Sequence, residues 1–421
     1  MHRSFPERAG CWWVRSAALV FILAGSALAP AAAAECRPGI YGEGPDAFVV
    51  LGAAVPTFGS GQRYLFRDGR RGSTAAPGSP LVCDADVATL KLPDGTTKRW
   101  PRNETRETDA PFESLATPLA GRLIEPPGAT NASRPLVVLV HGSEKTPAIG
   151  SVYAYMLAAQ GVSVFVYDKR GTGSSGGDYT QNFELLADDA AAALKSARSL
   201  AVGRFARAGF FGGSQGGWVA PLAATRSAAD FVAVGFGLVV SPIEEDREQM
   251  LDEAQKLNLG AEARAQIERL SHATAGLVRS HFESGYDEMA RVRRELGRAP
   301  WAATIKGEYS GDMLRMSDAD LRRIGRARFD NLELIWDYDA LATLRKLKAP
   351  LLWVLAGEDR EAPVATTLEI LLGLMAAGKP IDAYLFPQTD HGMVEFQTKA
   401  DGSRTPTRGS RTFRADWCAL L

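Results

Sequence analysis

Histidine and cysteine are scarce in this sequence, which has five histidines and four cysteines among its 421 residues. They do not occur in the closely spaced groups that bind zinc or iron, so we expect no metal site. The formal net charge of −1 gives the chain no basic field to attract nucleic acid or an anionic membrane. Low-complexity tracts and internal repeats are also missing, and a chain of this length with 46% hydrophobic residues has ample core.

Long apolar runs are missing as well. The clearest one, residues 17–29, is shorter than the ~20 residues that a helix needs to cross a bilayer. It follows a segment with three arginines and precedes four alanines at 31–34. This order is typical of a secretory signal peptide, so we interpret residues 1–34 as one, cleaved near Ala34. We therefore expect an exported, periplasmic or secreted protein with no membrane span in the mature chain. A retained membrane anchor is the alternative.

Three cysteines remain after this cleavage: Cys36, Cys83 and Cys418. In an oxidising compartment two of them should pair, and the odd number leaves one free thiol. A Cys36–Cys83 disulfide would staple the N-terminal region. The sequence does not choose the pair, and Cys36–Cys418 remains open.

The pattern of predicted strands and helices changes near residue 107. Residues 35–106 read as short strands cut by turns, which predicts a small β-rich N-terminal domain. From residue 107 to the C-terminus, apolar strand-like runs alternate with helices such as the alanine-rich one at 182–199. Strands and helices that alternate in this way predict the α/β class, with a mostly parallel sheet and helices on both of its faces.

The alternation stops between about 242 and 336, where charge-rich helical segments occupy the chain without a clear strand. An insertion at this place in an α/β domain usually sits over the carboxyl edge of the sheet, where ligands bind, so we interpret it as a helical cap. The strand rhythm then returns at residues 349–360, and residues 381–392 are expected to contain the last strand.

Four glycines surround one serine in the stretch "GGSQGG", residues 212–217. Glycine weakens a regular element by roughly 0.5–1 kcal/mol relative to alanine, so this number of glycines needs a reason. The spacing G-x-S-x-G between an apolar strand and a helix predicts a sharp turn that strains the serine backbone and exposes its hydroxyl. We predict that Ser214 is a nucleophile. A plain glycine-rich loop is the alternative interpretation.

A serine nucleophile needs a base and an acid that orients the base. His391 is the predicted base, because it lies beside a glycine just after the last expected strand. Asp359, in "AGEDR" after the preceding strand, is the predicted acid. The other histidines fit less well, since they lie in the signal peptide, in the cap, or before the serine in the chain: His2, His141, His272 and His281.

An oxyanion hole requires two backbone N–H groups aimed at the developing charge. The amide of Gln215, which follows the nucleophile at a helix N-terminus, is predicted to be one. The amide of Ser143, in the loop after the strand "LVVLV", is predicted to be the other. His141 and Gly142 would then shape that loop.

The motifs "LVHGS", "YDKRGTGSSGG", "GGSQGGW", "AGEDR" and "TDHGM" follow one another in this order. The chain resembles the α/β-hydrolase fold family from about residue 107 to 399, in particular its capped bacterial esterases and serine-peptidase-like members. The resemblance implies a triad of Ser214, Asp359 and His391 together with the two oxyanion amides. Many relatives carry histidine where this chain has Gly213, a difference expected to change access to the serine and not catalysis itself.

The function predicted from these residues is that of an exported serine hydrolase that cleaves a carboxylic ester through an acyl-enzyme, without a metal or organic cofactor. The runner-up is a serine aminopeptidase, in which Glu244, Glu245 or Asp246 of the cap would bind the amino group of a short peptide. A non-catalytic binding module is a third interpretation. The sequence leaves open the substrate, the oligomeric state and the role of residues 35–106.

One motif points to a different chemistry. Residues 171–176 spell G-x-G-x-x-G after a strand, the fingerprint of a dinucleotide site. No helix opens directly after it, and it sits in the third strand-like unit, so we do not predict nucleotide binding. Asp168, Lys169 and Arg170, which precede it, are expected to brace the loop by hydrogen bonds.

Overall fold

The computed structural model describes residues 35–126 and 134–409. The signal peptide predicted for residues 1–34 and Cys418 lie outside this part. The first described residues form two antiparallel sheets, one of four strands and one of three. The strands are β1 (Gly39–Gly44), β2 (Ala47–Ala54), β3 (Gln62–Phe66), β4 (Arg71–Ser73), β5 (Leu81–Asp84), β6 (Val87–Lys91) and β7 (Thr97–Pro101), with a 3₁₀ turn, η1 (Pro56–Phe58).

A disulfide bond joins Cys36, just before β1, to Cys83 in β5. Of the two pairings that the sequence left open, the one within the N-terminal region is therefore confirmed. Both cysteines are buried among apolar side chains of the two small sheets.

Replacing Cys36 and Cys83 by alanine is expected to lower the free energy of unfolding by about 2–4 kcal/mol. The bond spans 47 residues of sequence, so its loss gives the unfolded chain more conformational freedom. Urea unfolding followed by tryptophan fluorescence measures this difference. An unchanged unfolding midpoint would contradict it.

The largest sheet has eight strands in the order β17-β16-β15-β14-β12-β13-β11-β8. The six strands from β17 to β13 run parallel, and β11 is antiparallel to β13. Their bounds are β8 (Arg106–Asp109), β11 (Gly121–Glu125), β12 (Pro135–Val140), β13 (Ser163–Tyr167), β14 (Arg207–Gly213), β15 (Val232–Gly235), β16 (Leu351–Ala356) and β17 (Ile381–Phe386). The hairpin β9 (Phe112–Ser114) and β10 (Thr117–Leu119) lies outside the sheet.

The central strands are apolar along their length because both faces of the sheet are covered. In β12, Leu136, Val138 and Val140 join one hydrophobic core, while Val137 and Leu139 join another. The first core contains side chains of four helices: α2 (Phe183–Leu200), α3 (Gly216–Thr225), α9 (Ala340–Lys346) and α10 (Ala365–Ala376).

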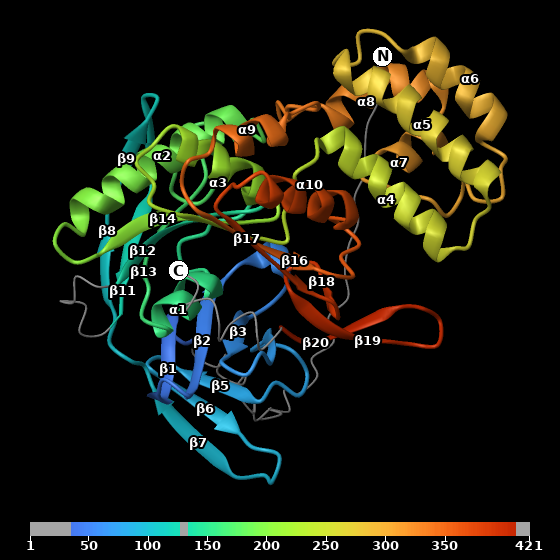
Figure 1. Cartoon of the computed structure of the whole chain (residues 1–421). Coiled ribbons are helices and arrows are strands. Elements are labelled where there is room, and N and C mark those ends of the chain that lie inside the picture. The colour runs from blue at the N-terminus through green and yellow to red at the C-terminus, as the bar shows by residue number, and fades with distance from the viewer. Residues whose placement is uncertain (1–34, 127–133, 410–421) are drawn as a thin grey trace, which may run out of the picture. The chain divides into compact units, whose positions relative to one another are not determined.

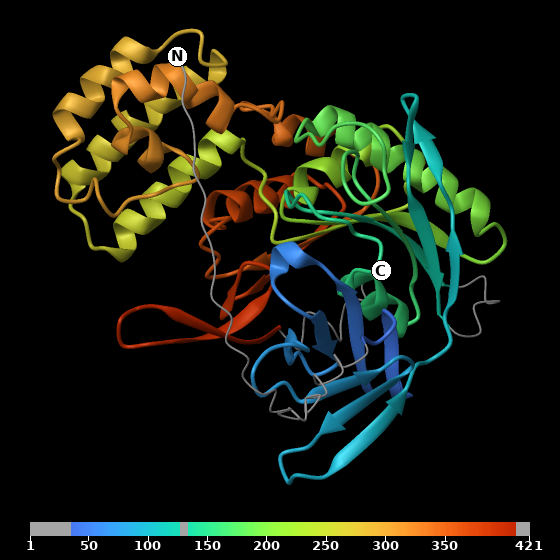
Figure 2. The same cartoon turned by 180° about the vertical axis from the view of Figure 1, so that it is seen from behind.

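The second face is covered by α1 (Val152–Ala159) together with β1, β2 and β3 (Figures 1 and 2). Ile40, Phe48, Val50 and Leu65 of these strands share a core with α1 and the sheet. The predicted α/β class with helices on both faces is confirmed, and the N-terminal strands take the place of further helices on this face.

Five helices occupy the segment predicted to be a cap, and Figure 1 shows them gathered in one cluster coloured yellow to orange. They pack around their own apolar core, centred on buried residues such as Leu270, Met289 and Met313. Their bounds are α4 (Pro242–Lys256), α5 (Ala261–Arg279), α6 (Tyr286–Leu296), α7 (Ser310–Arg315) and α8 (Asp318–Phe329). None of the helices within residues 35–126 and 134–409 is long and apolar enough to cross a membrane.

The expectation that residues 381–392 contain the last strand is wrong. They contain β17, the edge strand of the main sheet, and β18 (Thr389–Asp390), the first strand of a separate antiparallel sheet that continues with β19 (Val394–Thr398) and β20 (Arg404–Gly409). These strands are short and polar, so they lack the apolar run by which the strands of the main sheet are recognised.

Candidate active site

Ser214 lies at the carboxyl end of β14, directly before α3, with φ at +53°. Serine rarely adopts this left-handed conformation, and such strain is typical of functional sites. The flanking glycines are required by space. A Cβ atom on Gly212 would lie 2.1 Å from the carbonyl oxygen of Gly216, and one on Gly216 would lie 2.6 Å from the carbonyl oxygen of Val140. The glycine pattern therefore permits the close approach of β14, α3 and β12.

Asp359 and His391 lie in contact, Asp359 in the loop after β16 and His391 directly after the short strand β18, which follows β17 in the chain. The Nδ1 atom of His391 is 2.9 Å from Oδ2 of Asp359 and 3.1 Å from its Oδ1. Asp359 is buried and also accepts the backbone N–H groups of Glu361 and Ala362. Such a carboxylate can fix the tautomer of the imidazole and stabilise its protonated form.

The surroundings of His391 act on its pKa in opposite directions. Burial of the ring lowers the pKa, whereas the hydrogen bond to Asp359 and the charges of Asp359, Glu361 and Asp390 raise it. The raising contributions prevail, and the pKa of His391 lies above its ordinary value of 6.5. A general base must be neutral to accept a proton, and a histidine with a raised pKa is mostly neutral only at a pH above that raised pKa.

Ser214 and His391 both lie near the ring of Phe236. The ring centroids of Phe236 and His391 are 5.0 Å apart, and the Ser214 N–H donates to the carbonyl of the residue before Phe236. In the described part of the chain no hydrogen bond joins the Ser214 hydroxyl to His391. Nε2 of His391 is instead 3.6 Å from Oε2 of Glu361. Catalytic hydrogen bonds are often long in ligand-free enzymes and shorten when substrate binds.

The loop after β12 passes beside Ser214. A Cβ atom on Gly142 would lie 3.4 Å from the Cβ of Ser214. Two carbonyls of this loop accept hydrogen bonds from side chains. Nζ of Lys169 donates to the carbonyl of Gly142 over 2.7 Å, and the Tyr179 hydroxyl donates to that of Ser143.

Of the two amides predicted to form an oxyanion hole, that of Ser143 lies in this loop and that of Gln215 directly follows Ser214. Neither donates a hydrogen bond to any other residue within 35–126 and 134–409. Unengaged N–H groups of this kind are what an oxyanion requires.

Asp168 and Lys169, just after β13, hold the loop after β12, and Asp168 also holds the loop at residues 171–176, which the sequence analysis expected these residues to brace. Asp168 accepts the N–H groups of Ala148 and Ser174, and Arg170 donates two hydrogen bonds to buried Asp189.

Burial and the charge of Lys169 lower the pKa of His141 to about 3. His141 is therefore neutral at ordinary pH, and its Nε2 contacts the carbonyl of Tyr167.

Three carboxylates that come from distant segments lie close enough to act on one another: Glu245 of α4, Glu308 before α7, and Glu361 after β16, which is 3.6 Å from Nε2 of His391. Burial and the negative charges of Glu308, Asp246, Asp359 and Glu361 raise the pKa of Glu245 well above its ordinary value. Glu308 accepts a hydrogen bond from Gln249 of α4 over 2.6 Å. The sequence analysis missed Glu308 and Glu361, because nothing in their local sequence marks them.

The two other cap residues considered as amine ligands lie in different surroundings. Glu244 is exposed in the first turn of α4. Asp246 is buried, and it accepts the N–H groups of Tyr309 and Ser310. Asp246 therefore serves the packing of α4 against α7.

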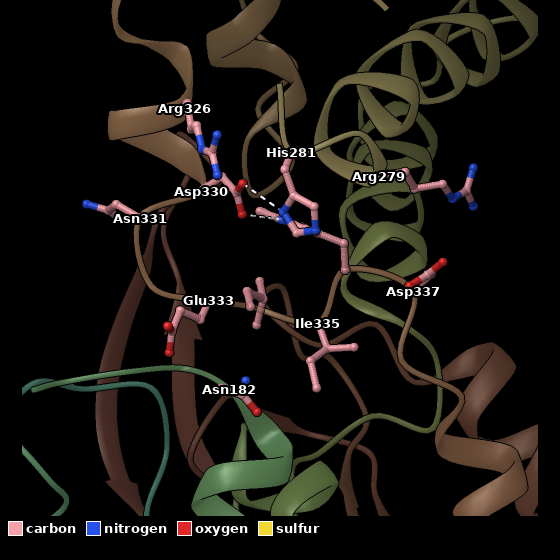
Figure 3. Close-up of a pocket in the computed structure, with 11 residues that line it drawn as sticks. Asn182, Arg279, His281, Arg326, Asp330, Asn331, Glu333, Ile335 and Asp337 are labelled. Atoms are coloured by element: carbon pink, nitrogen blue, oxygen red, sulfur yellow. Dashed lines mark hydrogen bonds and ion pairs between the residues drawn. The ribbon is translucent and has the colours of Figure 1, made fainter. Parts of the chain in front are cut away.

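A cavity of about 510 Å³ lies elsewhere, between the cap helices and the segment that leads out of them (Figure 3). Nδ1 of His281 in this cavity donates a hydrogen bond to the buried carboxylate of Asp330 over 2.9 Å. None of Ser214, Asp359 and His391 lines it. In the described ranges, no three His, Cys, Asp or Glu side chains lie together as metal ligands would.

Comparison with known families finds one match: a model described as serine aminopeptidase, S33, fits residues 131–278. This span includes Ser143, Ser214 and Gln215 and ends before Asp359 and His391. Comparison with the curated proteins finds no match.

Solved structures with a similar arrangement include two esterases and a peptidase. An esterase of Pyrococcus furiosus is 13% identical over 75% of this chain and 88% of its own, with a TM-score of 0.44. The acylaminoacyl peptidase of Pyrococcus horikoshii is 14% identical over 82% of this chain and 50% of its own, with a TM-score of 0.42. Brefeldin A esterase, a bacterial homologue of human hormone-sensitive lipase, is 17% identical over 73% of this chain and 73% of its own, with a TM-score of 0.43.

Proposed function

We propose that this chain, an α/β-hydrolase-fold protein of the esterase and peptidase kind, is an exported serine hydrolase that cleaves carboxylic esters through an acyl-enzyme. The observation that carries the proposal is the hydrogen bond between Asp359 and His391 at the same sheet edge as a strained Ser214. Parallel strands bring their carboxyl ends to one edge, which is where active sites of open α/β sheets lie.

In the proposed reaction, the Ser214 oxygen attacks the carbonyl carbon while Nε2 of His391 takes the hydroxyl proton. The amides of Ser143 and Gln215 stabilise the negative charge on the carbonyl oxygen. The C–O bond to the alcohol then breaks, and His391 returns the proton to the leaving oxygen. A water molecule, deprotonated by His391, attacks the acyl-enzyme, and the acid is released with Ser214 regenerated. Apart from the substrate and this water molecule, each step uses only side chains and amides of this chain.

The Cys36–Cys83 disulfide supports export, because such bonds persist in oxidising compartments. The order of arginines, apolar run and alanines in residues 1–34 supports it as well.

Labelling with a fluorophosphonate probe tests the proposal directly. The probe should form one covalent adduct at Ser214, and hydrolysis of p-nitrophenyl acetate should show a burst of p-nitrophenol as the acyl-enzyme accumulates. A folded protein that neither reacts with the probe nor hydrolyses the ester would be the non-catalytic binding module.

A second candidate function, a serine aminopeptidase, is favoured by the carboxylate group around Glu245. Burial raises the pKa of Glu245, and the negative charges of Glu308, Asp246, Asp359 and Glu361 raise it further. A bound ammonium group would neutralise this negative charge. The carboxylates would be its hydrogen-bond partners and would offset the cost of taking it out of water. Since Glu361 is 3.6 Å from His391, such an ammonium would sit beside the reacting carbonyl, as cleavage after the first residue requires.

Replacing Glu245 by glutamine separates the two functions. If the protein is an aminopeptidase, Glu245→Gln should raise KM for alanine p-nitroanilide about tenfold or more, because a hydrogen bond to a charged group contributes roughly 1.5–3 kcal/mol. Hydrolysis of p-nitrophenyl acetate, which has no amino group, should stay unchanged. Asp252→Asn is the control, since Asp252 lies on the same helix and pairs with Lys256. An N-acetylated anilide hydrolysed as fast as the free one would argue against the aminopeptidase.

A further inference from the structure

Arg404, the first residue of β20, connects the loop of Asp359 with the loop of His391. Its Nη1 donates to the carbonyl of Glu358 and to Oδ2 of Asp390, both over 2.7 Å. Its Nη2 donates to Oε2 of Glu358 over 2.5 Å. Each partner directly precedes one of the two residues, since Glu358 precedes Asp359 and Asp390 precedes His391.

The guanidinium group is held in place by its own sheet. Its side chain is only 8% exposed, and its carbon Cζ lies 3.8 Å from the centroid of the Phe396 ring in β19. A planar guanidinium that is stacked on a ring and paired with two carboxylates has little freedom to move. The sheet β18–β20 therefore presents Arg404 as a fixed group.

Both partners of Arg404 are coupled to the predicted catalytic residues. Asp390 accepts the backbone N–H of His391 with its Oδ1 over 3.0 Å, while its Oδ2 is held by Arg404. The Glu358 N–H donates to the carbonyl of Thr389, which already ties the two loops by their backbones. Arg404 adds a side-chain tie from the same Glu358 to Asp390, one residue closer to His391.

Arg404 also balances charge at this place. The charged groups that act on His391 are the carboxylates of Asp359, Glu361 and Asp390, and all three raise its pKa. The bond to Arg404 lowers the pKa of Asp390 against the effect of burial, so that Asp390 stays ionised while its charge is compensated by the guanidinium. Without Arg404 this charge would act on His391 uncompensated.

We propose that Arg404 is a positioning residue for the reaction: it sets the placement of Asp359 against His391 and offsets the charge of Asp390 beside the imidazole. This inference rests on the proposed function, since it assigns a role to a residue that touches neither substrate nor the reacting atoms. It gives one residue of the C-terminal hairpin β19–β20, which the sequence analysis did not foresee, a role in placing the predicted catalytic residues.

The expected effect of Arg404→Met is a fall in kcat of about 10- to 100-fold with KM nearly unchanged, because a small misplacement of catalytic groups costs about this much and ester binding does not involve Arg404. The acid limb of the pH profile of kcat/KM should move to higher pH, because loss of the cation stabilises protonated His391. Asp390→Asn should move the same limb to lower pH, because it removes a carboxylate from the ring.

The experiment measures kcat, KM and the pH profile for p-nitrophenyl acetate, on the full secreted chain, with the number of active sites counted by fluorophosphonate titration. Arg408→Met is the matched control. Arg408 lies on the same strand, is 37% exposed and pairs with Glu395, so its loss should leave kcat and the pH profile unchanged. Arg404→Lys keeps the charge but not the forked geometry, so its pH profile should stay near that of the wild type while kcat still falls.

Each outcome decides the inference. Opposite shifts of the acid limb in Arg404→Met and Asp390→Asn support it. An Arg404→Met protein that titrates fewer active sites, each with the wild-type kcat and pH profile, would show that Arg404 serves stability alone and would overturn it. Should Arg404→Met fail to accumulate, a wild-type kcat in Arg404→Lys overturns it equally. If the wild-type protein itself does not react with the probe, the proposed function fails first, which is a separate result.

Discussion

Replacing Ser214 by alanine is expected to lower kcat for p-nitrophenyl acetate by about 10⁶-fold and to abolish labelling by a fluorophosphonate. Alanine removes the only atom that forms the acyl bond. It keeps the Cβ and therefore the strain of the φ of +53°. Residual hydrolysis should remain above that of water, because the amides of Ser143 and Gln215 are untouched.

The stability of the variants provides the control for this prediction. Ser214→Ala should unfold at the same urea concentration as the wild type, whereas Ser214→Gly should be more stable by up to about 1 kcal/mol, because glycine adopts a positive φ without strain. Both variants should be equally inactive. Retained activity in folded Ser214→Ala would remove Ser214 from the mechanism and with it the proposed function.

Replacing Asp359 by asparagine is expected to lower kcat by about 10⁴-fold. The amide of asparagine donates to Nδ1 of His391, which moves the ring proton to Nε2, the atom that must accept the proton of Ser214. The two hydrogen bonds that Asp359 accepts from the backbone of Glu361 and Ala362 need only one of its oxygens, so asparagine preserves them and the fold should remain intact.

The pH profile separates this effect from a loss of structure. In the wild type, the midpoint of the acid limb of kcat/KM should lie above pH 6.5, since the pKa of His391 is raised. In Asp359→Asn, the hydrogen bond and the charge that raise this pKa are gone and burial still lowers it, so the limb should move to lower pH. A limb that stays in place, or a kcat within tenfold of the wild type, would contradict the role of Asp359.

Much of the fold follows from local patterns. The alternation of apolar strands and helices predicted the α/β class, and the family match together with the strand order confirms it. The pattern failed at β18–β20, because three short polar strands bury too little apolar surface to mark themselves in the sequence. The boundaries of the domains and the signal peptide stay predictions.

The predicted site divides in the same way. The structure brings Asp359 and His391 into hydrogen-bond contact and places Ser214 at a strained turn. The assignment of these three residues and of the amides of Ser143 and Gln215 to catalytic roles stays a prediction. The sequence named Glu245 as one of three possible amine ligands, but it did not predict Glu308, Glu361 or the hydrogen bonds of Arg404, since the partners of these residues are distant in sequence and follow no fixed spacing.

By itself, the amino-acid order indicated the apolar strands of the main sheet and the small residues that allow a tight bend after one of them, because steric limits on the backbone act over a few neighbouring residues. Only the tertiary structure decided that Cys36 pairs with Cys83, that three acidic side chains from distant segments come together, and that Arg404 bonds to two loops at once. Such meetings depend on how whole elements pack, and packing is a property of the entire chain.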